Sequence, residues 1–497
     1  MWTGAQEFIW ARSRYVVQTP CPTETPPDWD QVTIDILSND ILLCIFYEYA
    51  NGPYKGEEWR TLVHVCRRWR TLVFGSPRHL NLQLFCWIGT QVTKKLDIWP
   101  TFPIVVCHRF CQDCKMPVDN LIAAIKHNDR VCEVDFHTFR VWDKSQMEEV
   151  VSAMQVSFPA LTDLTLCLTD DFETVMVIPN SFLGGSAPCL RRLHLEGMSF
   201  PGLPKLLLST TSLVSLELCL PHYWYISPDT MVACLSALAR LKLFILEFES
   251  PQPRQDRRRH LPPPTRTLLP ALTFLGFKGV DEYAEDLMTR IDVPLLHSLH
   301  ITFLNEIIRN VPQLSQFINR TPTFQAFDDA RVAIFDDQST ITLPLPIRTT
   351  GCESEALVLG ISLEEETVEQ LSSLTHLCRS LLPTIAKVEH LDIDGEGSLI
   401  PLDWSDEGAR RSDWLELLRL FTGAKNLHLS KDIAPCISSY LREVAEERMT
   451  DVLPALKNLS ACLYGFQREG PDSVGEDLKC FVAARQLGYT LLLYVLQ

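Results

Sequence analysis

Residues 158–168 read FPALTDLTLCL, and this segment contains the pattern that decides the fold. Leu161, Leu164 and Leu166 occupy the apolar positions of an L-x-x-L-x-L motif that follows a proline. Apolar residues at alternating positions are typical of a short β-strand with one buried face. One such strand cannot bury its apolar face alone, so the motif should recur in neighbouring strands.

The motif recurs along most of the chain, and its second apolar position falls at Val134, Leu164, Leu193, Leu216, Leu246, Leu275, Leu299, Leu391, Leu427 and Leu459. The first seven of these positions are 23 to 30 residues apart. Leucine-rich repeats have a similar period of about 20–29 residues, with one short strand in each repeat. The gap of 92 residues before Leu391 is close to three periods, and candidates for hidden units lie near Val332 and Val358.

This period predicts an α/β fold in which an irregular leucine-rich-repeat solenoid forms a horseshoe of short parallel strands. Helices or loops are expected on its convex side, with helical segments at residues 119–127 and 412–421 as examples. The asparagine that usually follows the repeat strand is mostly missing, and several units are longer than the usual period. Both features favour an irregular array.

The composition limits the possible classes of function. The chain has 497 residues, of which 46% are hydrophobic, and its formal charge is −17. A nonspecific nucleic-acid binder needs a basic surface to displace phosphate counterions, so neither DNA nor RNA is an expected partner. No run of about 20 apolar residues and no secretory signal is visible, so we expect no membrane association and a cytosolic or nuclear protein. The 17 cysteines are dispersed and should be reduced and mostly buried.

The first 80 residues predict a small helical module. Residues 1–34 are a proline-rich acidic lead that should be mobile. Ser38 is a good N-cap, and Asp40 complements the dipole of a helix that Asn-Gly-Pro at residues 51–53 should end. A second helical stretch is expected at residues 57–74, with a solvated flank of arginines: Arg60, Arg67, Arg68 and Arg70.

Two patterns in this module belong together: LSNDILLCIF at residues 37–46 and LVHVCRRWRTL at residues 62–72. In this order and at this spacing they resemble an F-box, although Ser38 stands where that family usually has proline. The resemblance implies that the module binds a Skp-type adaptor protein of a cullin ubiquitin ligase, through a few apolar anchors that enter a groove. The residues implied in this contact are Leu37, Ile41, Leu42, Ile45, Phe46, Val63, Cys66, Trp69 and Leu72.

The whole layout resembles F-box proteins with C-terminal leucine-rich repeats, including a large group from mushroom-type fungi. This resemblance implies the substrate-recognition subunit of an SCF-type ubiquitin ligase, which is not an enzyme itself and whose repeats bind an unknown protein substrate. The implied domains are residues 35–80 for the F-box, 81–130 for linker strands and a first repeat helix, and 131–497 for the repeat array. Within the array, residues 249–267 are rich in proline and arginine and are expected to form a disordered loop.

Two other hypotheses remain open. In the first, the chain is a binding scaffold outside any ligase, and the helical module caps the end of the solenoid. A cap would bury Ile41, Leu42, Ile45 and Phe46 against the repeats, whereas a docking module would leave them exposed. In the second, the chain is a hydrolase or a metalloprotein. No phosphate-binding loop, nucleophile elbow or His-Glu-x-x-His motif supports it.

Two segments have the spacing of metal sites but are better explained otherwise. Cys111, Cys114, His127 and Cys132 have zinc-finger spacing, yet Cys132 falls within a repeat strand. Residues 392–403 mimic a calcium-binding loop, yet a strand precedes them where that motif requires a helix. The sequence therefore predicts no metal, no cofactor and no catalytic residue.

Overall fold

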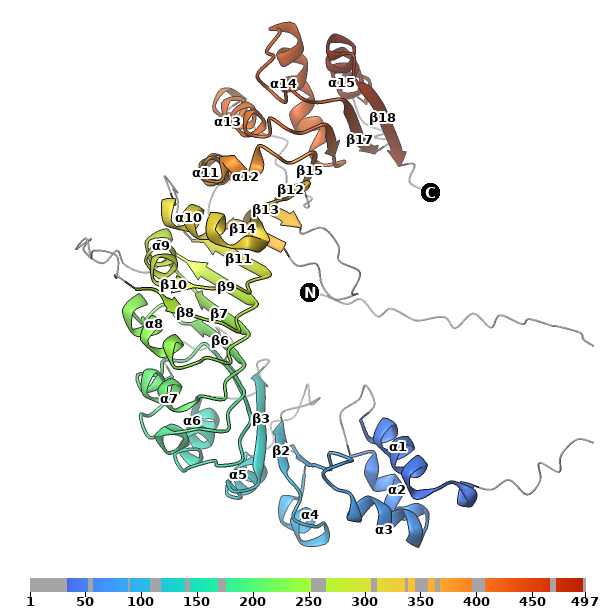
Figure 1. The fold of residues 1–497 in the computed structure, drawn as a ribbon, viewed down its shortest axis with the longest axis vertical. Helices are drawn as coiled ribbons and strands as arrows, with labels where there is room; N and C mark the ends of the chain where they lie inside the picture. The colour runs from blue at the N-terminus through green and yellow to red at the C-terminus, as the bar shows by residue number, and fades with distance from the viewer. Residues whose placement is uncertain are drawn as a thin grey trace, which may run out of the picture. The chain divides into compact units, whose positions relative to one another are not determined.

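The computed structural model describes residues 34–51, 57–87, 90–107, 118–138, 144–168, 176–251, 265–304, 311–335, 338–344, 356–362, 367–395, 407–464 and 471–494. The chain divides into two compact units, Met1–Leu82 and Gln83–Gln497. We call them unit 1 and unit 2 and describe each by itself (Figure 1).

Unit 1 contains a short 3-10 helix, Ile34–Ile36, and the helices α1 (Asn39–Ala50), α2 (Trp59–Val65) and α3 (Arg67–Gly75). The predicted start of α1 is confirmed, because the Ser38 side chain accepts a hydrogen bond from the Ile41 backbone N–H at 3.4 Å. Asp40 lies in the first turn, and Asn51 forms the C-cap. The local sequence therefore sets both ends of this helix.

The second helical stretch predicted at residues 57–74 is two helices, because the chain is extended at Cys66, with φ −155° and ψ 171°. The Cys66 thiol accepts a hydrogen bond from the Trp69 N–H at 3.5 Å and so caps α3. The break turns the apolar side chains of α2 and α3 toward a common core with α1. The largest members of that core are Phe46 and Trp59, and the Phe46 ring lies 4.7 Å from the Trp69 ring, centroid to centroid.

Of the arginines predicted to be solvated, Arg70 is exposed and Arg68 is partly buried, and both also hold unit 1 together. Arg68 donates to the Leu37 carbonyl at 2.6 Å and to Asn39 Oδ1 at 2.9 Å, which ties α3 to the start of α1. Arg70 donates to the Val63 carbonyl at 2.8 Å, across the break between α2 and α3. Arg60 is exposed and pairs with Glu57 at 3.0 Å. Planar guanidinium groups suit these contacts because several donors are fixed in one fork.

The described residues of unit 2 form a sheet of 16 strands in the order β1-β2-β3-β4-β5-β6-β7-β9-β11-β14-β13-β12-β15-β16-β17-β18. The strands are β1 (Leu84–Cys86), β2 (Ile104–Cys107), β3 (Val131–Thr138), β4 (Asp163–Leu168), β5 (Arg192–Glu196), β6 (Ser215–Leu220), β7 (Leu243–Phe248), β9 (Phe274–Gly279), β11 (Ser298–Phe303), β12 (Asp329–Ile334), β13 (Gln338–Pro344), β14 (Ala356–Ser362), β15 (His390–Gly395), β16 (Asn426–Leu429), β17 (Asn458–Tyr464) and β18 (Gly488–Tyr494). A separate pair joins β8 (Thr267–Leu268) and β10 (Ile291–Asp292). The fold is therefore mixed α/β with a large, mostly parallel sheet.

The helices of unit 2 lie between many of the successive strands and along one face of the sheet (Figure 1). They are α4 (Val92–Ile98), α5 (Asp119–Ile125), α6 (Lys144–Ala153), α7 (Leu203–Ser209), α8 (Pro228–Ser236), α9 (Asp281–Arg290), α10 (Pro312–Arg320), α11 (Thr367–Ser380), α12 (Leu382–Ile385), α13 (Glu407–Leu420), α14 (Ala434–Glu446) and α15 (Pro471–Arg485). The helical segments predicted before Val131 and Leu427 are confirmed as α5 and α13. Among the described residues, no helix is long and apolar enough to cross a membrane.

Buried and partly buried residues alternate along the strands, so the two faces of the sheet differ. In β6, Leu216, Leu218 and Leu220 are buried, whereas Ser215, Glu217 and Cys219 are only partly buried. The buried residues belong to a continuous core shared with the helices. The second apolar position of every predicted motif lies in a strand, so the repeat pattern locates the sheet. We call the face without helices the open face.

The register predicted for one repeat is wrong. In the sheet, Leu216 of β6 pairs with Phe244 of β7, and Phe244 pairs with Leu275 of β9. The second apolar position of this repeat is therefore Phe244 and not Leu246. The distances from this position to the second apolar positions of the two neighbouring repeats change by two residues. The strand itself lies where the pattern predicted it.

The predicted hidden units near Val332 and Val358 are strands β12 and β14, but they are not successive parallel repeats. β13 lies between them and is antiparallel to both. As a result β14, the last of the three in the chain, pairs with β11, and β12 pairs with β15. The gap of 92 residues therefore contains a three-stranded meander in reversed order among its described residues, where two hidden parallel repeats were expected.

Several sequence predictions fall on residues outside those described. These are the mobile lead up to residue 33, the loop at residues 252–264, Cys111 and Cys114 of the rejected zinc pattern, and residues 396–403 of the rejected calcium pattern. Thr267, which was included in the predicted loop, instead begins β8. Cys132 lies in β3, as expected for a repeat cysteine.

Candidate functional site

A row of exposed apolar side chains runs along α1 of unit 1. Ile41, Ile45 and Tyr49 are spaced four residues apart and retain 50%, 45% and 47% of their accessible surface. Side chains at this spacing lie above one another on one face of a helix. We call this surface the α1 stripe. Large apolar side chains that are exposed together, as here, mark interaction surfaces more often than scattered single ones do.

The residues predicted to bind an adaptor have three different environments. Leu42, Phe46 and Val63 are fully buried. Ile41 and Ile45 are exposed, and the remaining members are partly buried: Leu37, Cys66, Trp69 and Leu72. The buried three cannot contact a partner while unit 1 stays folded, so their role is in its core. Of the predicted set, the exposed isoleucines are the best placed for docking.

The prediction did not include Tyr49, which completes the α1 stripe. Its spacing of eight residues from Ile41 was the signal available in the sequence, because residues i, i+4 and i+8 share one helix face. The exposed Ile34 and Ile36 precede α1 and were also not included. These residues enlarge the apolar surface of unit 1 beyond the predicted set.

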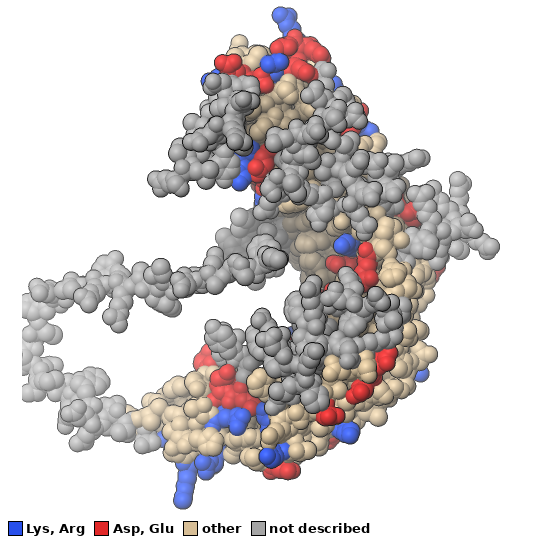
Figure 2. All heavy atoms as spheres, turned by 180° about the vertical axis from the view of Figure 1, so that it is seen from behind, with Lys and Arg blue, Asp and Glu red and all other residues tan. Residues whose placement is uncertain are grey.

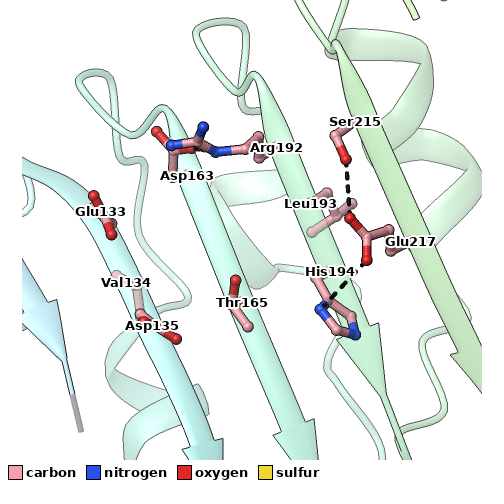
Figure 3. A pocket seen from close by; sticks show the side chains of 10 residues that line it. All are labelled: Glu133, Val134, Asp135, Asp163, Thr165, Arg192, Leu193, His194, Ser215 and Glu217. Carbon is pink, nitrogen blue, oxygen red and sulfur yellow. Dashed lines mark hydrogen bonds and ion pairs between the residues drawn. The ribbon is translucent and has the colours of Figure 1, made fainter. Parts of the chain in front are cut away.

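A second candidate site lies on the open face of unit 2, where β3 to β6 form a pocket of about 130 Å³. Its polar lining comes from alternate positions of adjacent strands, and Figure 3 shows these side chains on the side of the strands away from the helices. The lining residues with charged or hydroxyl groups are Glu133, Asp135, Asp163, Thr165, Arg192, His194, Ser215 and Glu217. Acidic side chains also recur over the surface of unit 2 that is visible from behind (Figure 2).

Hydrogen bonds and ion pairs order the side chains of this pocket. Arg192 pairs with Asp163 on the neighbouring strand. The His194 ring lies between two carboxylates: Nδ1 is 3.9 Å from Glu217 Oε2, and Nε2 is 3.7 Å from Glu196 Oε2. Glu217 also accepts a hydrogen bond from the Ser215 hydroxyl at 3.1 Å.

Two cysteines flank the pocket on β4 and β6. Cys167 Sγ lies 3.8 Å from His194 Nε2, and Cys219 Sγ lies 3.4 Å from Glu247 Oε2. Burial and the negative charge of Glu196 raise the pKa of the Cys167 thiol well above its usual range. Burial and Glu247 do the same to the pKa of Cys219. Both thiols are therefore protonated at neutral pH, and neither is activated as a nucleophile.

Sequence reasoning missed this site because it treated Cys167 and Cys219 as buried apolar residues. The signal that could have found it is the alternation within the motif, which places Cys167, His194 and Glu196 at polar positions of their strands. Pairing those positions across the sheet requires the correct register between repeats.

No known protein-family model matches the chain. A comparison with curated proteins also finds no significant match to any part of it. The functional conclusion therefore rests on the residues and geometry given above.

Proposed function

We propose that this protein is the substrate-recognition subunit of an SCF-type cullin ubiquitin ligase. In this proposal unit 1 is an F-box that binds a Skp-type adaptor, and unit 2 is a leucine-rich-repeat solenoid that binds a protein substrate. The protein would catalyse no step itself, and it would act by raising the effective concentration of substrate near the ligase. The observation that carries the proposal is the exposed α1 stripe on a small, separately compact helical unit.

The geometry of unit 1 suits helix-in-groove recognition. Such contacts use apolar anchors at i and i+4 spacing, and a few large side chains supply most of the binding free energy. Ile41, Ile45 and Tyr49 have this spacing, and the cap at Ser38 and the Arg68 contacts fix the helix that presents them. Because α1 is already ordered, little conformational entropy would be lost on docking.

The topology of unit 2 supports the second part of the proposal. From β3 to β7 each strand pairs in parallel with the next one in the chain, as stacked repeats require. The helices cover one face, and no helix among the described residues lies on the open face, which is the surface we assign to the partner. The carboxylates on that face would favour a substrate segment with basic residues. The proposed substrate is therefore a protein with a basic segment.

The test is binding of the full-length chain to a purified Skp-type adaptor, with an Ile41→Ser/Ile45→Ser double variant. Truncating a dominant anchor costs about 2 kcal/mol or more, so we expect the double variant to bind at least about 30-fold more weakly. Its thermal unfolding should change little, because both side chains are half exposed. Calorimetric titration would measure the affinity.

A matched control is Ile98→Ser, which removes an equally apolar side chain that is 71% exposed on α4 of unit 2. This variant should bind the adaptor as the unmodified chain does. Unchanged affinity in the Ile41→Ser/Ile45→Ser variant, with its fold intact, would contradict the docking role. If the unmodified chain also fails to bind any adaptor, the scaffold hypothesis takes its place.

A further inference from the structure

Three side chains with metal-binding groups converge on the open face of unit 2. Cys167 lies on β4, and His194 and Glu196 lie on β5, with Cys167 and Glu196 directly paired between the strands. One ligand atom from each of these side chains lies within 4.8 Å of the other two. Parallel pairing fixes this arrangement, because all three occupy open-face positions of adjacent strands.

The distances between these atoms are close to those of a zinc centre. Cys167 Sγ is 3.8 Å from His194 Nε2, and His194 Nε2 is 3.7 Å from Glu196 Oε2. Bonds of about 2.3 Å to sulfur and about 2.0 Å to nitrogen, at a tetrahedral angle, place the two ligand atoms roughly 3.5 Å apart. Shifts of a few tenths of an ångström would bring the Sγ–Nε2 and Nε2–Oε2 pairs to such distances, and Cys167 Sγ already lies within 4.8 Å of a Glu196 carboxylate oxygen.

We propose that Cys167, His194 and Glu196 bind one Zn²⁺ ion on the open face of the sheet. Thiolate, imidazole and carboxylate together favour zinc and similar transition metals over Ca²⁺ and Mg²⁺, which prefer sites made of oxygen ligands alone. Three protein ligands leave the fourth position of a tetrahedral ion for water or for a group of a bound partner.

The surroundings of His194 also match those of a metal ligand. Nε2 faces Cys167 and Glu196, while Nδ1 faces Glu217 Oε2 at 3.9 Å, and Glu217 is held by Ser215. Metal-binding histidines almost always direct their second ring nitrogen to a carboxylate, a carbonyl or water, which fixes the ring orientation. In the metal-bound site we expect Nδ1 to donate to Glu217, so Glu217 would be a positioning residue whose loss weakens metal binding without removing a ligand.

Binding also changes the protonation of Cys167. A cysteine binds zinc as its thiolate, so the incoming ion must displace the thiol proton. The sulfur then forms a bond to the ion, and the proton passes to solvent or buffer. Neutralisation of Glu196 by the ion favours this exchange, because its charge no longer opposes ionisation of the thiol.

A similar pair elsewhere in the sheet serves as an internal control. Cys462 Sγ lies 3.8 Å from His428 Nε2, the same separation as at the proposed site, and His428 Nδ1 lies 2.9 Å from the Ser460 hydroxyl. Among the residues that the structure describes, however, only Cys167, His194 and Glu196 bring three possible ligands together. The Cys462 pair should therefore bind a divalent ion weakly.

The proposal is tested with the full-length chain, treated with chelator and titrated with Co²⁺, which reports its ligands by absorption. We expect one equivalent to produce an intense thiolate-to-cobalt charge-transfer band that added Zn²⁺ removes. Cys167→Ser should abolish the band, and His194→Gln should lower the affinity by more than about 100-fold while keeping the thiol. Glu217→Gln should lower it by about 10-fold to 100-fold.

The control variant Cys462→Ser should keep both the band and the affinity. Circular dichroism of each variant would verify the fold. If Cys167→Ser does not fold, the loss of Co²⁺ affinity in His194→Gln tests the proposal. The proposal is overturned if the folded protein gives no charge-transfer band, or if the band survives in Cys167→Ser. Loss of the band in Cys462→Ser would equally overturn it. The inference does not depend on the ligase proposal, because metal binding is measured without an adaptor.

Discussion

Replacing Phe46 with alanine is expected to unfold unit 1 while unit 2 stays folded. The Phe46 side chain is completely buried, and its ring packs on Trp69 at 4.7 Å. Truncation of a buried phenylalanine costs about 3–5 kcal/mol, and a core as small as that of unit 1 has little stability to lose. Hydrogen exchange followed by mass spectrometry would measure this, with loss of protection in α1 to α3 and unchanged protection in β4 to β6.

The neighbouring residue provides the control. Ile45→Ala removes a side chain from the same helix, but that side chain is 45% exposed, so the change in unfolding free energy should be within about 0.5 kcal/mol. Unchanged protection of α1 in Phe46→Ala would show that the buried ring does not hold the unit together. If the expected result is found, loss of adaptor binding in Phe46→Ala reports unfolding, and only the exposed stripe can test docking.

The contrast between these two residues shows what the sequence could and could not predict about unit 1. The helical spacing and the caps were sufficient to locate α1. They did not separate Phe46 from Ile45, because both are large apolar residues on a helix whose sides are nearly all apolar. One step along a helix rotates a side chain by about 100°, and only packing against α2 and α3 decides which one is buried.

In unit 2 the motif located the strands because alternation of buried and exposed residues is a local property. It failed to set the register of β7, since Leu241-x-x-Phe244-x-Leu246 and Leu243-x-x-Leu246-x-Phe248 both fit the motif. Buried positions recur every two residues along a strand, so a slip of two residues keeps the same face buried and leaves the pattern intact.

The meander of β12, β13 and β14 was missed for a different reason. Buried and exposed residues alternate every two residues whichever way the strand runs. The pattern therefore cannot show whether a strand is parallel or antiparallel to its neighbour. The proposed metal site depends on the same long-range information. Cys167 and His194 are 27 residues apart in the chain, and they meet only because β4 pairs with β5 in one particular register.

The second large effect is expected from Gly197→Ala, at the end of β5. Gly197 has a φ of +71°, and a Cβ atom there would clash with the Leu168 carbonyl oxygen of β4. The left-handed conformation alone costs an L-residue roughly 1–2 kcal/mol. The contact with backbone adds to this, because relieving it requires β5 to move away from β4. Urea unfolding should show a loss of stability clearly above 2 kcal/mol.

Gly185→Ala separates the conformational cost of a left-handed residue from the steric cost of the contact with Leu168. Gly185 has a φ of +74°, but the nearest atom to its Cβ would be Lys205 Nζ at 3.5 Å, the end of a flexible side chain. This variant should lose only the conformational part, and equal losses in the two variants would contradict the close approach of β5 to Leu168. Because Gly197 directly follows Glu196, a shift of β5 would also displace that carboxylate from Cys167. Gly197→Ala should therefore weaken Co²⁺ binding as well, whereas Gly185→Ala should leave it unchanged.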